Sequence, residues 1–139
     1  MFVLDTNVVS ELRKVRAGKA NRGVAEWAIG VPSAHLFISV MTLHELELGV
    51  LLAERRDTRQ GASLRQWFDE SVSVAFTDRT LVIDGTVAKR AAALHDPDPA
   101  PLRDAFIAAT ALVYRMTVVT RNVRDFKRFE GLGVINPWA

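Results

Sequence analysis

Short apolar runs alternate with longer amphipathic segments along most of the chain. Runs with the length and β-branched content of buried strands lie at residues 2–4, 36–41, 80–83, 117–119 and 134–135. Apolar residues recur at helical spacing between them, which predicts helices over residues 8–16, 24–29, 42–54, 61–71, 85–95, 104–116 and 122–129. Three prolines within residues 96–101 predict a loop there.

This alternation predicts an α/β protein. Strands that alternate with helices favour a central, mostly parallel sheet with helices on both faces, a three-layer α/β/α sandwich. The helix at residues 104–116 is apolar on nearly all sides, so we expect it to be central and buried. Neither a repeat nor a linker interrupts the 139 residues, which predicts a single domain over residues 1–139.

The composition of the chain limits which metal ligands it can offer and indicates its location in the cell. The chain contains no cysteine, so disulfides and thiolate metal sites are excluded and any hard metal ion would need oxygen ligands. The first residues lack the basic and then apolar regions of a secretory signal, and no apolar run approaches the roughly 20 residues that span a bilayer. We therefore expect a cytoplasmic protein that does not contact membranes.

Basic residues gather in three stretches, although the net charge is only +2. Arginine, which favours bidentate contact with phosphate, is much commoner than lysine. The stretches are Arg13, Lys14, Arg16, Lys19 and Arg22; Arg55, Arg56, Arg59 and Arg65; and Arg121, Arg124, Lys127 and Arg128. Each alone is typical of a solvated face, but together they are compatible with a phosphate backbone as the partner.

Four acidic residues stand at the ends of strands or the starts of helices. Asp5 ends the first strand, and Glu45 and Asp125 lie in the first turns of the helices after the second and fourth strands. Because sites in open parallel sheets form beyond the carboxyl ends of the strands, these three are expected at one edge. Asp104 begins the buried helix, and its position does not follow from the strand order.

Each acid also fits a structural role. Thr42 and Glu45 have the spacing of a capping box, Asn122 and Asp125 share that spacing, and Asp104 is a plausible helix cap. Four such carboxylates at one edge would repel each other and raise each other's pKa. A bound Mg²⁺ or Mn²⁺ removes that conflict, so the shared edge predicts a divalent-metal site.

Phosphodiester hydrolysis suits such a site, because a bound metal ion polarises the phosphate and lowers the pKa of a water molecule. Whether one ion or two would bind is left open. Thr6, Asn7, Thr120 and Asn122 are supporting residues that are expected to orient ligands or waters. Arg103, directly before Asp104, is expected to reach a substrate phosphate or a neighbouring acid.

Five motifs carry a resemblance to a known family. The chain resembles PIN-domain ribonucleases of the VapC and FitB type, in order and at familiar spacing over residues 2–138. The motifs are Asp5-Thr-Asn-Val8, Glu45-Leu-x-x-Gly49, Asp104-Ala-Phe-Ile-Ala-Ala-Thr-Ala111, Thr120-Arg-Asn-Val-Arg-Asp-Phe126 and Gly131-Leu-x-Val-x-Asn-Pro-Trp138.

The resemblance implies a PIN fold and a Mg²⁺-dependent endoribonuclease, with Mn²⁺ as a substitute, that acts as the toxin of a type II toxin–antitoxin pair. It implies a homodimer that binds RNA as substrate, a small antitoxin as partner, and operator DNA only through the antitoxin. Asp5 and Asp104 correspond to direct metal ligands, and Glu45 and Asp125 complete the acidic quartet, either directly or through water.

Alternatives remain on the same fold. The chain is also compatible with a DNA-directed or structure-specific nuclease, or with a FitB-like component of a nucleic-acid complex. The sequence does not distinguish a tRNA, rRNA or mRNA target. Among other residues near the acids, we expect Glu47 to be solvated, His44 to be structural or at the surface, and Trp67 to pack in the core or an interface.

Overall fold

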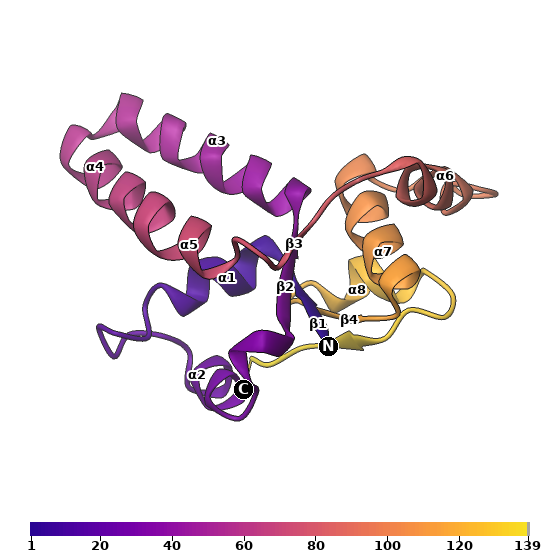
Figure 1. Ribbon diagram of the computed structural model, residues 1–139, viewed down its shortest axis with the longest axis horizontal. Coiled ribbons are helices and arrows are strands. Elements are labelled where there is room, and N and C mark those ends of the chain that lie inside the picture. Colours follow the sequence, from indigo (N-terminus) through magenta and orange to yellow (C-terminus); the bar gives the residue numbers. More distant parts are fainter. Residues whose placement is uncertain (139) are drawn as a thin grey trace.

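Parallel strands form the centre of the protein in the computed structural model, which describes residues 1–138 (Figure 1). The strands are β1 (Phe2–Leu4), β2 (Leu36–Ser39), β3 (Thr80–Leu81), β4 (Thr117–Val119) and β5 (Val134–Ile135). They form a five-stranded sheet in the order β3-β2-β1-β4-β5, and every pairing in it is parallel. The predicted parallel sheet is confirmed.

Helices cover both faces of this sheet, as predicted. One side carries α1 (Thr6–Leu12), α2 (Arg22–Ile29), α3 (Val40–Arg56), α4 (Thr58–Trp67), the π-helical turn η2 (Phe68–Val72) and α5 (Ser73–Ala75); η1 (Ser33–His35) leads into β2. The other side carries α6 (Gly85–Ala93), α7 (Leu102–Tyr114) and α8 (Val123–Lys127). Figure 1 shows these groups on opposite sides of the strands, with α3 and α4 extending away from them.

Alternating residues of β1 build the two cores. Leu4 packs in one cluster with apolar residues of α1 and α3, including Val8 and Leu46. Val3 points to the opposite face and packs with Ile107 of α7 and Phe126. Because successive strand side chains point to opposite faces, a three-residue strand can serve two apolar layers.

The helix α7 is buried on most of its surface. Its residues Ile107, Ala108 and Ala111 face the sheet, and Ala109 packs against Val87 and Ala91 of α6. The predicted central helix is therefore confirmed. Within residues 1–138 no helix combines the length and the apolar character that crossing a membrane requires.

Several boundaries differ from the prediction because capping side chains fix them. The strand predicted over residues 36–41 ends at Ser39, whose hydroxyl accepts a hydrogen bond from the Met41 amide at 3.1 Å and caps α3. Asp57 accepts from the amides of Arg59 and Gln60, so α4 begins at Thr58 instead of residue 61. Asp5 caps α1 in the same way, and this helix begins at Thr6 instead of Val8.

The helical hairpin of α3 and α4 requires a residue without a side chain at position 61. A Cβ atom at Gly61 would lie 2.4 Å from the Glu54 Cα and 2.7 Å from its backbone nitrogen. Gly49, in the exposed middle of α3, has nothing within 4 Å of the same position. The two glycines therefore have different physical roles.

Gly61→Ala should destabilise the protein by about 1–3 kcal/mol, because the added methyl group meets backbone that must shift. Gly49→Ala should stabilise it by about 0.5–1 kcal/mol, since alanine loses less conformational entropy in a helix. Urea unfolding of both variants measures the difference. Equal effects of the two substitutions would contradict the close packing of α3 against α4.

Candidate active site at the carboxyl edge of the sheet

Asp5 is a fully buried carboxylate between the ends of two adjacent strands. It follows β1 and caps α1, with the Thr6 amide donating to Oδ1 at 2.8 Å. The register of β1 with β4 brings Thr120 beside it, and the Thr120 hydroxyl donates to Oδ2 at 2.7 Å. The Asn7 side-chain amide lies 3.5 Å from the same oxygen. Both carboxylate oxygens are thus held by donors from the turns after β1 and β4.

The supporting residues tie these two turns together. The Asn122 amide donates to the Thr120 hydroxyl at 3.0 Å, and the Arg121 amide donates to Asn7 Oδ1 at 3.3 Å. The structure therefore places Thr6, Asn7 and Thr120 around Asp5. Asn122 contributes its backbone amide and is the N-cap residue of α8, but its side chain makes no capping hydrogen bond.

Glu45 reaches the same edge from α3. The Thr6 hydroxyl donates to Glu45 Oε1 at 2.6 Å and lies 3.3 Å from the buried Thr42 hydroxyl. The alternative role of Glu45 in a capping box with Thr42 does not hold, because α3 begins at Val40 and Ser39 is its cap. For the same reason Glu45 lies in the second turn of this helix, and not in the first turn that was predicted. Free of the capping role, the Glu45 side chain extends toward the end of β1.

Asp104 lies in the first turn of α7 and is only 7% exposed. Burial raises the pKa of its carboxyl group, the nearby charges of Asp125 and Asp5 raise it further, and the Arg103 guanidinium partly opposes them. Asp125, in the first turn of α8, is exposed, and the contacts of Arg103 do not include it. The structure thus brings Asp5, Glu45 and Asp104 together, and Asp125 stays a predicted member at the rim of the site.

The Arg103 guanidinium lies among three carboxylates. Its Nε is 2.6 Å from Glu45 Oε2, one terminal nitrogen is 2.7 Å from Asp104 Oδ1, and the other contacts Asp5 Oδ1. Burial alone would lower the pKa of Arg103, but its hydrogen bonds and charge interactions with Glu45 and Asp5 outweigh this and raise it. Arg103 was expected to reach either a substrate phosphate or a neighbouring acid, and its contact with neighbouring acids is confirmed.

The donor set fits a hard divalent cation. Three carboxylates from separate elements converge on one positive group, and carboxylate oxygens are the ligands that Mg²⁺ and Mn²⁺ prefer. As the side chains stand, no three acidic or histidine residues within residues 1–138 lie close enough together to hold a metal ion. The Arg103 guanidinium supplies the positive charge among the three carboxylates.

A cavity of about 200 Å³ adjoins Glu45 on the α3 and α4 side of the site. Its polar wall includes Thr6, Ser10 and Glu45, and its apolar wall includes Trp67. Arg13 lies over the Trp67 ring at 5.8 Å from the centroid. No sequence signal pointed to Ser10, one turn beyond Thr6 on α1. Trp67 packs against the core as expected, and it also lines this cavity.

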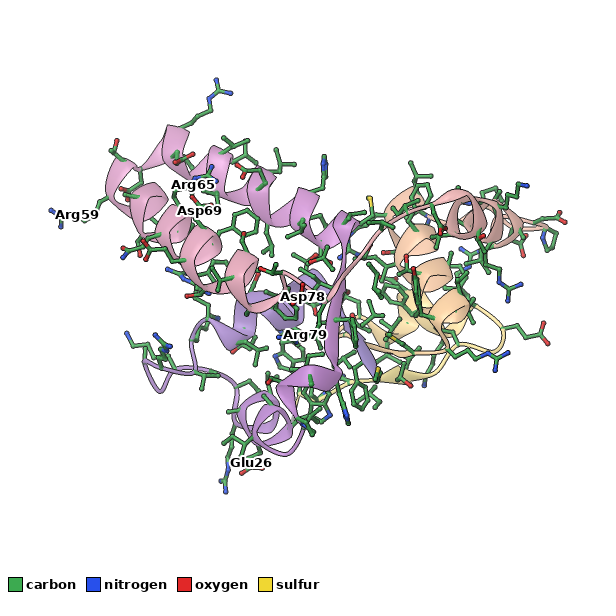
Figure 2. All side chains as sticks on the ribbon, viewed as in Figure 1. Glu26, Arg59, Arg65, Asp69, Asp78 and Arg79 are labelled. Atoms are coloured by element: carbon green, nitrogen blue, oxygen red, sulfur yellow. The ribbon has the colours of Figure 1, made fainter. Side chains whose placement is uncertain are left out.

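Glu47, on the same helix as Glu45, belongs to a separate ion-pair cluster. Two nitrogens of Arg65 contact its two oxygens at 2.8 and 2.6 Å, and 42% of its side chain stays exposed, so Glu47 is solvated as expected but is also paired. These hydrogen bonds lower the pKa of Glu47, with burial opposing them. Figure 2 shows Arg65 beside Asp69 between α3 and α4, and Arg65 also pairs with Glu54. His44 is exposed, as expected.

Several known proteins are similar to this chain in sequence and fold. VapC ribonuclease Y4jK of Sinorhizobium fredii is 32% identical to the chain, over 99% of the chain and 98% of the relative. A solved structure of FitAB bound to an IR36 DNA fragment superposes with a TM-score of 0.87 at 30% identity, covering 100% of this chain and 96% of the other. A toxin–antitoxin complex from Klebsiella pneumoniae gives a TM-score of 0.67 at 26% identity, covering 99% and 98%.

The family model of the PIN domain matches residues 2–132, which include all four acids and every strand of the sheet except β5. The resemblance seen in the motifs and the arrangement of the strands is thereby confirmed, and the chain belongs to the PIN-domain family.

Proposed function

We propose that this protein is a metal-dependent endoribonuclease and the toxin of a type II toxin–antitoxin pair. The observation that carries the proposal is the convergence of Asp5, Glu45 and Asp104 at the carboxyl edge of a PIN-domain sheet. The name of the relative Y4jK, a VapC ribonuclease, supports RNA cleavage as the reaction.

Mg²⁺ is the proposed cofactor, with Mn²⁺ as a substitute. Asp5 and Asp104 would hold it directly, and Glu45 and Asp125 would do so directly or through water. Bound there, the ion would polarise the scissile phosphate and lower the pKa of the attacking water.

The chain's own groups prepare the site for this chemistry. The Thr6 amide and the Thr120 hydroxyl fix the orientation of Asp5, and the Thr6 hydroxyl fixes that of Glu45. Complete burial of Asp5 keeps bulk water away from the floor of the pocket, which strengthens every charge interaction there. Asp125, at the rim, adds a negative charge that favours cation entry.

The surroundings of the carboxylates support a single-stranded RNA substrate. Arg13 lies over Trp67 beside the cavity, and Arg121, whose amide is bound to Asn7, lies over Trp138 at 5.4 Å from the ring centroid. Paired arginines and aromatic rings are suited to contact phosphates and unstacked bases. Arg65 is a poor candidate, because three carboxylates already surround it.

The proposed assembly is a homodimer bound to a small antitoxin, acting in the cytoplasm as one PIN domain over residues 1–139. The Klebsiella toxin–antitoxin complex, 26% identical to the chain, supports the antitoxin as partner. The DNA-bound FitAB structure supports a second candidate function, in which the protein acts mainly as a component of a DNA-bound complex. Operator DNA would then be contacted through the antitoxin.

Purified protein should cleave RNA with Mg²⁺ or Mn²⁺, lose cleavage in EDTA and leave duplex DNA intact. Asp5→Asn or Asp104→Asn should reduce the cleavage rate by about 100-fold or more, because each removes a negative ligand. Asp78→Asn is the matched control, since this exposed aspartate precedes β3, at the opposite edge of the sheet. Cleavage of DNA alone, or full activity in EDTA, would defeat the proposal.

Expression without an antitoxin should arrest bacterial growth, and Asp104→Asn should remove this effect while leaving protein abundance unchanged. Colony counts after induction, with immunoblotting for abundance, provide the measurement. If the variant remains as toxic as the original protein, binding within a complex, and not catalysis, is the function.

Thr120→Val should slow RNA cleavage by about 10–100-fold and lower the unfolding free energy by about 1–3 kcal/mol, because a buried carboxylate loses its hydroxyl donor. Thr120→Ser keeps the hydroxyl and should retain most of the cleavage rate and most of the unfolding free energy. Cleavage rates and urea unfolding test the pair. Equal behaviour of valine and serine at this position would show that the hydroxyl does not position Asp5.

A further inference from the structure

Every nitrogen of the Arg103 guanidinium is engaged by a different acid of the pocket. Nε faces Glu45 at 2.6 Å, and the two terminal nitrogens face Asp104 and Asp5. These acids come from α3, from α7 and from the end of β1, so the arginine joins three separate elements. Such a planar fork matches carboxylates in a way that a lysine cannot.

The contacts of Arg103 use the same oxygens that a metal ion would need. Asp5 Oδ1 is shared between Arg103 and the Thr6 amide, while Oδ2 is taken by the Thr120 hydroxyl. One oxygen of Glu45 is bound by Arg103 and the other by the Thr6 hydroxyl. A divalent cation and the guanidinium therefore compete for the same small volume and for the same charges.

The side chain of Arg103 also has a route out of the pocket. It is 29% exposed, whereas that of Asp5 is 0% exposed and that of Asp104 is 9% exposed. Arg103 lies in the first turn of α7, directly after the proline-containing loop of residues 96–101, and its flexible stem can rotate without moving the helix. Asp5, in contrast, is held by the Thr6 amide and the Thr120 hydroxyl, and Glu45 is held by the Thr6 hydroxyl.

We propose that Arg103 is a built-in counter-ion that occupies the carboxylate pocket, and that a divalent cation binds only by displacing its guanidinium. This inference rests on the proposed function, because it assumes that the protein requires a divalent metal ion. It adds that Arg103 competes with this ion and so sets the metal concentration at which the protein becomes active. A positioning role, in which Arg103 prepares the acids for the metal, would have the opposite effect on metal affinity.

Isothermal titration calorimetry of the full chain with Mn²⁺ distinguishes the two roles. Arg103→Gln should bind Mn²⁺ about tenfold or more tightly than the original protein, because charge-assisted hydrogen bonds no longer have to be broken. Unchanged or weaker binding in this variant would overturn the proposal.

Arg59→Gln is the matched control. Arg59 is an exposed residue of α4 and points away from the protein (Figure 2). Its removal changes the net charge by the same amount and should leave Mn²⁺ affinity unchanged. If it tightens Mn²⁺ binding as much as Arg103→Gln, the effect is one of overall charge and the proposal fails.

Thermal unfolding gives a readout that does not depend on activity. In EDTA, Arg103→Gln should melt below the original protein, because three close carboxylates lose their counter-ion; saturating Mn²⁺ should remove most of this difference. A difference that persists in Mn²⁺ would contradict the exchange of one cation for another. If the glutamine variant does not fold in EDTA, Arg103→Lys, which keeps the charge but not the fork, should still bind Mn²⁺ more tightly than the original protein, and equal or weaker binding would overturn the proposal.

Failure of the inference and failure of the proposed function are distinguishable. If the original protein cleaves RNA with Mn²⁺ but Arg103→Gln gains no affinity, only the counter-ion role is wrong. If neither protein binds Mn²⁺ or cleaves RNA, the metal site itself is absent and both proposals are wrong.

Discussion

Burial of the Asp5 carboxylate is the constraint on which the rest of this structure depends. A charged group without exposed surface must be both hydrogen-bonded and neutralised, or it would be too costly to keep. The hydrogen bonds come from the turns after β1 and β4, which requires these strands to be neighbours. The neutralising charge comes from Arg103 on α7, which requires that helix to begin beside the ends of both strands. The order of the strands, the position of α7 and the arrangement of the site therefore all depend on stabilising the buried Asp5 carboxylate.

Much of the fold follows from local pattern. The apolar runs at β1, β2 and β4 and the nearly uniform apolarity of α7 were enough to predict a parallel sheet between two helical layers. Helix starts were harder, because Ser39 and Asp57 act as caps through one or two hydrogen bonds that several nearby polar residues could equally have made. The turn at Phe68, where α4 continues as a π-helix, has no sequence signal that we recognise.

The sequence predicted which residues belong to the candidate site better than it predicted the contacts between them. Parallel topology alone places Asp5 and Glu45 at one edge, but the position of Asp104 depends on how far α7 extends toward the sheet after its loop. The Thr6 to Glu45 hydrogen bond joins residues 39 positions apart, and the Arg103 to Asp5 pair joins residues 98 positions apart. Such contacts depend on side-chain rotamers chosen in the assembled core, which residue spacing does not encode.

The long separations along the chain have a consequence for protein synthesis. Thr120 holds Asp5 across 115 positions, and Asp125 lies still nearer the carboxyl end. Because domains are made from the amino end, a nascent chain has Asp5 available long before Thr120 and Arg103 leave the ribosome. The complete pocket can therefore form only after residue 120 has been made. A shorter nascent chain carries Asp5 without the hydroxyl that orients its carboxylate, so its acids are not yet arranged as a site.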